Sequence, residues 1–275
     1  MNETEFIRSK ALWEECFGDG MTFVDWYYRT RTRPEYVLGA FSDGMPIAML
    51  HMIPMKMRFS GRAYDISFVA GVCTKPEYRQ RGVCAELFKN AFPIMAERGF
   101  DATVIQPFSA AFYERFGYKT FIRRKRTVLE QNDSTTVQTM PYDCTNTAVR
   151  PYELLKLYND FTSRFGGCSI RDENYFKGFI EEFSAPNARL TVTENGCSAG
   201  YEEDGAFVAY ELFFRDGEDP VGLLPKGYKK YVFPLPEDMD TPNNCSSEIE
   251  EFSMLKPLKS SFIPASEKFY GFDKY

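Results

Sequence analysis

The chain has 275 residues and a formal net charge of −6, and 44% of its residues are hydrophobic and 16% aromatic. This is enough apolar material for one large or two modest domains that fold without disulfide staples. The acidic balance argues against a general nucleic-acid binder, and we interpret the basic clusters at 29–34 and 123–126 as solvated strand or loop ends.

The first half of the chain predicts two helices followed by an antiparallel meander. Phe6, Trp13 and Phe17 share one helical face, and Asp43–Gly44 favours a hairpin turn between two apolar runs. In chain order we expect helices over 5–17 and 23–28 and strands over 36–41, 46–52, 55–59 and 66–74.

A polar stretch that begins at Gln131 predicts a linker over 131–149, between a first domain over 1–130 and a second over 150–275. The second half repeats the order of the first. Helical stripes precede three strands, which are separated by Asn195–Gly196 and Asp204–Gly205 turns. It lacks a glycine-containing junction between a strand and a helix, so we expect a related fold without its own cofactor site.

Such a junction does occur in the first half, at VCTKPEYRQRGVCAELF over 72–88. The start of a helix offers unpaired backbone N–H groups and the positive end of a dipole, which can hold a pyrophosphate without a metal. Gly82 permits close backbone approach, and Arg79 and Arg81 add positive charge. By shape alone the feature is common in soluble proteins, so a loop that binds nothing stays open at this point.

The pattern V-x-T-x-P-x-Y-R-x-R-G, followed by an amphipathic helix, resembles motif A of the GNAT acetyltransferases, with the core [QR]-x-x-G-x-[GA]. Arg79 and Gly82 match this core, and Cys84 departs from its last position. Further on, DATVIQPF and SAAFYERFGYKTF resemble the closing strand and helix of that fold. The pair PEYRQRGV and FYERFGY is similar to the enhanced intracellular survival (Eis) branch, whose members often also lack the last glycine.

The resemblance implies an α/β (α+β) GNAT fold, with a central mixed, mostly antiparallel sheet flanked by helices, followed by a second, degenerate GNAT-like domain. The Eis branch adds a sterol-carrier-like domain, and we interpret the stretch from Glu251 onward as a shortened remnant of it.

The same resemblance implies an N-acetyltransferase that uses acetyl-CoA and transfers the acetyl group directly to a primary amine. Tyr113 would be the general acid, and the C-terminal carboxylate of Tyr275 is a candidate for the catalytic base. A small-molecule or peptide amine would enter near Trp26 and Phe108. The residues implied for acetyl-CoA are Val72, Cys73, Thr74, Arg79, Gln80, Arg81, Gly82, Val83 and Cys84.

Several alternatives accompany this interpretation. His51, the only histidine, is interpreted as a satisfied strand residue rather than a base. An acyl-cysteine route through Cys73 or Cys84 is less favoured than direct transfer, because no histidine is positioned in the sequence to activate either thiol. A non-catalytic CoA-binding sensor or interaction module is the competing function, and a homo-oligomer is left open.

The seven cysteines are odd in number and contain no CxxC pair, which predicts reduced thiols rather than a disulfide framework or a metal site. The first residues lack a basic start followed by an apolar core, and no run of 18 apolar residues occurs. We therefore expect a soluble, cytoplasmic protein without a membrane partner.

Overall fold

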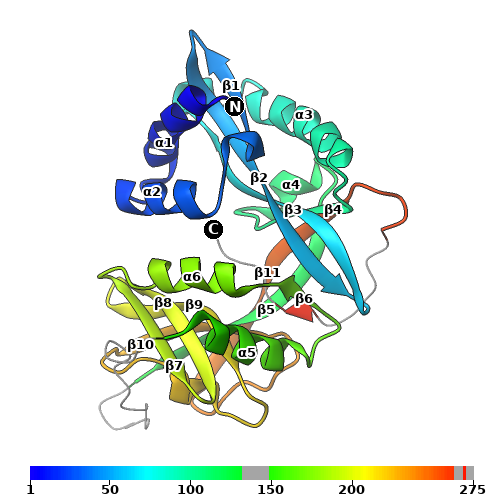
Figure 1. Ribbon diagram of the computed structural model, residues 1–275. Helices are drawn as coiled ribbons and strands as arrows, with labels where there is room; N and C mark the ends of the chain where they lie inside the picture. Colours follow the sequence, from blue (N-terminus) through cyan, green and yellow to red (C-terminus); the bar gives the residue numbers. More distant parts are fainter. Residues whose placement is uncertain (132–148, 263–268, 271–275) are drawn as a thin grey trace. The chain divides into compact units, whose positions relative to one another are not determined.

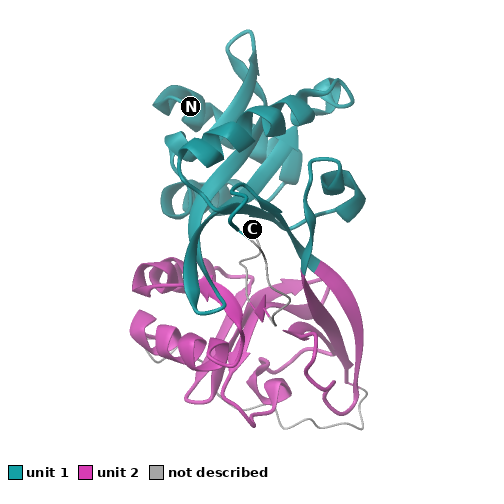
Figure 2. Cartoon of the chain, turned by 90° about the vertical axis from the view of Figure 1, so that its right-hand side faces the viewer, with its two compact units in different colours: residues 1–121, 252–267, 271–275 teal, residues 122–251, 268–270 magenta. Residues whose placement is uncertain are grey.

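The computed structural model describes residues 1–131, 149–262 and 269–270. They divide into two compact units, which Figure 2 colours separately. The first contains residues 1–121 and 252–262, and the second contains residues 122–131, 149–251 and 269–270. None of the helices in these ranges has the length and hydropathy of a membrane span.

The first unit is a mixed sheet with helices on both faces (Figure 1). Strands β1, β2 and β3 form an antiparallel meander, β3 pairs in parallel with β4, and β4 pairs antiparallel with the end of β11 (Cys245–Pro257). Its other elements are α1 (Glu3–Phe17), α2 (Met21–Thr30), η1 (Pro34–Tyr36), β1 (Val37–Ser42), β2 (Met45–Phe59), β3 (Arg62–Thr74), η2 (Pro76–Tyr78), α3 (Val83–Glu97), β4 (Ala102–Ile105) and α4 (Ala110–Glu114).

Helix α1 begins and ends at residues that suit those positions. The Asn2 side chain accepts a hydrogen bond from the backbone N–H of Glu5, and the Glu5 carboxylate accepts one from the N–H of Asn2. The helix ends at Gly18, which adopts the left-handed conformation with φ 70° and donates its N–H to Glu14. A short sequence signal therefore sets both ends of the helix.

Alternation along β2 separates the two cores of this unit. Met49 packs with the aromatic cluster of α1 and α2, whereas Leu50 and Met52 pack under α3 and α4. The same alternation in β3 turns Cys73 toward α1 and Val72 toward α3. Opposite faces of one strand therefore meet helices from different parts of the sequence.

The second unit builds a similar sheet. Strands β7, β8 and β9 form an antiparallel meander, β9 pairs in parallel with β10, β10 pairs antiparallel with β5, and β6 pairs in parallel with β12. Its elements are β5 (Lys119–Glu130), α5 (Pro151–Thr162), β6 (Gly167–Ile170), α6 (Glu173–Glu182), β7 (Ala188–Thr193), β8 (Gly196–Glu203), β9 (Ala206–Phe214), η4 (Pro220–Leu223), β10 (Lys230–Pro236) and β12 (Phe269–Tyr270).

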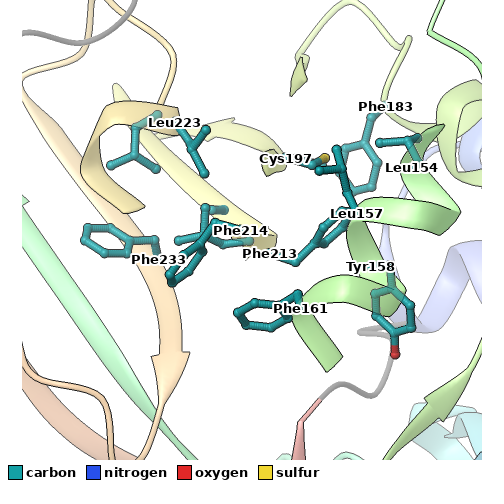
Figure 3. Close-up of a cluster of buried hydrophobic side chains, with 14 of the residues drawn as sticks. Leu154, Leu157, Tyr158, Phe161, Phe183, Cys197, Phe213, Phe214, Leu223 and Phe233 are labelled. Atoms are coloured by element: carbon teal, nitrogen blue, oxygen red, sulfur yellow. The ribbon is translucent and has the colours of Figure 1, made fainter. Parts of the chain in front are cut away.

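The core of this unit joins α5 to its sheet. Leu154, Tyr158 and Phe161 share the inner face of α5 and pack with Phe213 and Phe214 of β9, as Figure 3 shows. The expected helices and three-strand meander of the second half are confirmed by α5, α6 and β7 to β9. Spacing predicted them correctly because their apolar faces are regular.

Two strands belong to a different unit from the element that precedes them in the sequence. Strand β5 follows α4 of the first unit but pairs with β10, and β11 follows β10 of the second unit but pairs with β4. Between the parallel strands, the first unit has the long helix α3, whereas the second has only the 3-10 turn η4. The second unit therefore repeats this order of strands with η4 in the place of a long helix.

The structure differs from the sequence expectations at two places. The runs 46–52 and 55–59 belong to one strand, β2, because pairing with β3 continues through Pro54 opposite Ser67. Residues 252–262, expected in the second domain, cluster with the first unit, since Met254–Pro257 pair with β4. The expected linker, 131–149, falls almost wholly outside the described residues, and along the chain the first unit passes into the second at 121/122.

Candidate functional site

Strand β3 runs past the end of β4. The parallel pairing of the two strands stops at Val69 opposite Ile105, whereas β3 continues to Thr74. On its other side β3 stays paired with β2 up to Thr74 opposite Ala48. Among the described residues, no strand therefore pairs with residues 70–74 on the β4 side, and this stretch offers backbone donors and acceptors to an extended amide chain.

Gly71 shapes this free edge. Its φ is 56°, and it lies where the β2–β3 register shifts between Met49 and His51. A Cβ at Gly71 would lie 2.5 Å from the Trp13 ring and 3.3 Å from Cδ2 of His51. Since both rings are buried, only glycine fits between the strand and α1.

We expect Gly71→Ala to lower the free energy of unfolding by about 1–3 kcal/mol, from the unfavourable φ and the clash with Trp13. Urea denaturation measures this loss. Gly61→Ala is the matched control, because Gly61 also has a positive φ but a Cβ there meets nothing within 4 Å. Equal losses in the two variants would show that φ alone explains the effect and that Trp13 plays no part.

The loop after β3 turns its backbone toward the start of α3. Gln80 has a φ of 61° and Gly82 a φ of 80°, and alternating conformations of this kind direct successive N–H groups to one side. Helix α3 begins after Gly82 without a side-chain cap. In the described part of the chain, none of the N–H groups of residues 80–85 donates to a protein acceptor. They form a concave set of free donors at the positive end of a helix.

Two arginines of the same loop, Arg79 and Arg81, add positive charge near these donors. The Nε of Arg79 donates to the carbonyl of Thr74 at 3.0 Å, which ties the loop to the end of β3. The guanidinium of Arg81 lies 5.5 Å from the ring centroid of Tyr78. Both arginines are exposed, so their charge favours an anion at the start of α3.

These elements enclose a pocket of about 720 Å³, a size usual for small-molecule sites. It contains eight of the nine residues predicted for acetyl-CoA, and the exception is Arg81. Two arginines and no carboxylate line it, so it suits a negatively charged ligand. The full lining is Cys16, Phe17, Val72, Cys73, Thr74, Tyr78, Arg79, Gln80, Gly82, Val83, Cys84, Ala85, Phe108, Phe112 and Arg115.

Tyr113 lies outside this lining. Its side chain is 3% exposed, and its ring contacts those of Phe108 and Phe112 with centroids 5.5 and 5.0 Å away. Burial raises the pKa of the phenol above its ordinary value, and the nearby Cys84 adds to this. The hydroxyl makes no hydrogen bond with any residue that the structure describes. Tyr113 is therefore a protonated phenol that lies behind Phe108 and Phe112, which line the pocket.

Of the other predicted site residues, some line the pocket and some do not. Phe108 is 76% exposed and lines the pocket, whereas Trp26 is 7% exposed in the α1–α2 cluster and does not. His51 is buried with Nδ1 3.3 Å from the hydroxyl of Tyr27, and burial lowers its pKa to about 3, so the ring stays neutral. This agrees with a strand residue rather than a base. Tyr275 lies outside the described residues.

Sequence reasoning missed part of the lining. Tyr78 and Ala85 lie inside the motif, and Arg115 follows Tyr113 closely, so a wider reading of the same segments would have found them. Arg115 lies 4.0 Å from the ring centroid of Phe112. Cys16 comes from the end of α1, and no pattern in the sequence connects it to the loop.

Known proteins share this fold. The structures of GCN5-related N-acetyltransferases from Anabaena variabilis and Kribbella flavida are 13% and 17% identical, with TM-scores of 0.71 and 0.65. In both cases the match covers 94% of this chain, and it covers 71% and 69% of the respective relatives. Eis1 from Mycobacterium abscessus is 16% identical with a TM-score of 0.67, over 94% of this chain and 72% of its own. No curated protein sequence matches the chain.

A family model described as an acetyltransferase (GNAT) domain matches residues 1–121. The matched range ends where the first unit passes into the second along the chain, and it contains the free edge of β3, the loop and α3. Sequence pattern, fold and site geometry agree on one family for this part of the chain. Residues 1–121 belong to the GNAT acetyltransferases.

Proposed function

We propose that the chain is an N-acetyltransferase that moves an acetyl group from acetyl-CoA to a primary amine of a small molecule or peptide by direct attack. The observation that carries the proposal is the set of free N–H groups at 80–85, which begins a helix beside a pocket lined by two arginines and no carboxylate. The pocket continues to the unpaired edge of β3.

The residues present fit acetyl-CoA, which supplies an acetyl group activated as a thioester. The N–H groups of 80–85, with Arg79 and Arg81, would hold its diphosphate. The edge of β3 at Val72–Thr74 would pair with the amides of its pantetheine arm, and a backbone N–H there would polarise the thioester carbonyl. The carbonyl of Thr74 already accepts from Arg79, which leaves Val72 and Cys73 for this pairing.

Tyr113 would donate its proton to the leaving sulfur. Its raised pKa keeps the proton on the phenol at neutral pH, although it also makes donation to a thiolate less favourable than an ordinary tyrosine would. Phe108, exposed at the pocket, would guide the amine, and Trp26, which is buried in α2 and does not line the pocket, would act only by supporting the wall of the entry. His51 would be a poor base, because burial lowers its pKa to about 3 and it does not line the pocket. An amine with a low pKa needs no base, and the carboxylate of Tyr275 is the remaining candidate.

Ala85→Glu tests the proposed diphosphate site, because it adds a negative charge there without disrupting the helix. Ala85 is exposed at the third position of α3, where a carboxylate stabilises a helix but repels a diphosphate. We expect the dissociation constant for CoA to rise about 10- to 100-fold while thermal stability is kept. Isothermal titration calorimetry and thermal melting measure the two effects.

Ala85→Gln is the control of nearly equal size, and its affinity for CoA should stay within about threefold of the wild type. If Ala85→Glu binds CoA as tightly as Ala85→Gln, the anion does not lie at the start of α3 and the proposed site is wrong.

A CoA-binding sensor is the second candidate, favoured by one observation. Tyr113 does not line the pocket, and its hydroxyl lies among aromatic rings. An acetylation assay over a panel of amines separates the two functions: a protein that binds CoA but acetylates none of them is a sensor. The cytoplasmic location and the relation to the Eis branch are part of the same proposal, the latter supported by the shared fold of Eis1.

A further inference from the structure

Two cysteines from distant parts of the sequence meet at the wall of the pocket. Cys16 lies in the last turn of α1 and Cys73 near the end of β3, and both line the pocket. Cys16 packs against the buried cluster that contains Cys73. Cys16 is half-buried, whereas Cys73 is buried against α1, so only the first is open to a reagent that enters the pocket.

The segments that carry the two thiols are held together independently of the sulfurs. Nζ of Lys75, just after β3, lies 3.2 Å from Oε2 of Glu15 in α1. Cys73 is itself paired with Met49 in β2. The packing of α1 in the cluster with Met49 and Cys73, together with this ion pair, therefore keeps the end of α1 beside the end of β3 whether or not the thiols react.

The charges around the pair make the two thiols unequal. The hydrogen bond from Cys73 and the attraction of Arg79 lower the pKa of Cys16 to about 7, against the opposing effects of burial and Glu15. The pKa of Cys73 is raised, first by its hydrogen bond to Cys16 and then by burial. At pH 7 the Cys16 sulfur is therefore about half ionised, whereas the Cys73 sulfur stays protonated. A nucleophilic and a resolving cysteine have this relationship.

We propose that Cys16 and Cys73 are a peroxide-sensitive pair whose disulfide narrows the CoA pocket. The Cys16 thiolate attacks one oxygen of hydrogen peroxide, the O–O bond breaks and hydroxide leaves, which gives a sulfenic acid. The sulfur of Cys73 then attacks the Cys16 sulfur, the S–O bond breaks, and the oxygen leaves as water with the thiol proton. Two thiols lose two electrons, and one peroxide becomes two waters.

The disulfide would act on the site because both residues form its wall. Closing an S–S bond of about 2.05 Å draws the end of α1, with Phe17, toward the β3 edge that would pair with pantetheine. This coupling rests on the proposed function. Because linkage is reciprocal, bound CoA should also shift the thiol–disulfide equilibrium toward the reduced pair. We expect CoA affinity to fall at least about tenfold on oxidation.

The test treats the full-length protein with hydrogen peroxide and then with dithiothreitol. Peptide mapping by mass spectrometry identifies the disulfide, and calorimetry measures CoA affinity at each stage. Cys16→Ser and Cys73→Ser should each lose the response to peroxide relative to their own untreated states. Cys245→Ser should respond as the wild type does, because Cys245 is half-buried outside the pocket.

A second measurement examines the pair without oxidation. Alkylation of Cys16 by iodoacetamide should reach half its maximal rate near pH 7, and Cys73→Ala should move this midpoint upward by removing the thiol hydrogen bond. Arg79, Glu15 and the Lys75 ammonium are the charged groups that face the pair, and all are retained in this variant.

The outcomes are distinct. A Cys16–Cys73 disulfide with weakened CoA binding, reversed by dithiothreitol, supports the proposal. A map without this disulfide, or a disulfide that leaves CoA affinity unchanged, overturns it. If the reduced wild type does not bind CoA at all, the proposed function fails, and the peptide map still decides whether the thiols form a pair.

Discussion

Replacing Tyr113 by phenylalanine should lower kcat about 100-fold or more while the KM for acetyl-CoA stays within about threefold. The substitution removes one hydroxyl and keeps the ring contacts with Phe108 and Phe112. Because that hydroxyl bonds to no described residue, the loss should come from the missing proton donor rather than from the fold. Steady-state kinetics with a reactive amine, supported by thermal melting, measures both quantities.

Tyr118→Phe is the matched control for this experiment. Tyr118 is a buried phenol in the same aromatic cluster, with its ring centroid 6.3 Å from that of Tyr113, but its hydroxyl is hydrogen-bonded to Thr103 at 3.1 Å. Losing that bond should cost about 1 kcal/mol of stability and leave kcat nearly unchanged. Full activity in Tyr113→Phe would remove Tyr113 from the mechanism and require another acid, such as water.

The largest loss of stability is expected from Glu211→Ala in the second unit. Glu211 accepts two hydrogen bonds from Arg171, at 2.6 and 3.2 Å, and the Arg171 side chain is 1% exposed. The guanidinium also lies 4.3 Å from the ring centroid of Tyr158. Without the carboxylate, the buried guanidinium loses two charged hydrogen bonds, which costs about 3–5 kcal/mol. The melting temperature should fall by about 6–20 °C, followed by circular dichroism.

A double variant shows whether charge or packing causes this loss. Arg171→Met combined with Glu211→Leu removes both charges and keeps much of the volume, so it should recover most of the stability that Glu211→Ala loses. If the double variant is as unstable as the single one, the aromatic contacts of Arg171 matter more than its ion pair.

The residues predicted for acetyl-CoA are close together in the sequence, and for this reason most of them line one pocket. Val72 to Cys84 form one continuous strand, loop and helix start, and backbone geometry alone brings eight of the nine predicted residues to one pocket. Gly82 adopts the left-handed conformation before α3, as a glycine at that position would. Arg81 is the exception, since its guanidinium stacks on Tyr78 instead.

The surroundings of that site depend on residues that no pattern connects. Cys16 reaches the pocket only because α1 packs across β3, and the burial of Tyr113 follows from how α4 meets α3 and the sheet. Whether a tyrosine in FYERFGY lines a pocket or lies behind it is a matter of side-chain packing, which spacing does not encode.

The sequence by itself determined the order of helices and strands, the glycine-led start of α3 and the family of residues 1–121, because periodicity, turn residues and a short motif act over neighbouring positions. Only the tertiary structure decided that β5 pairs with β10, that the end of β11 pairs with β4, and that Cys16 packs beside Cys73. Strand pairing and thiol contact join residues far apart in the chain, and their partners are chosen by the burial of whole faces rather than by local preference.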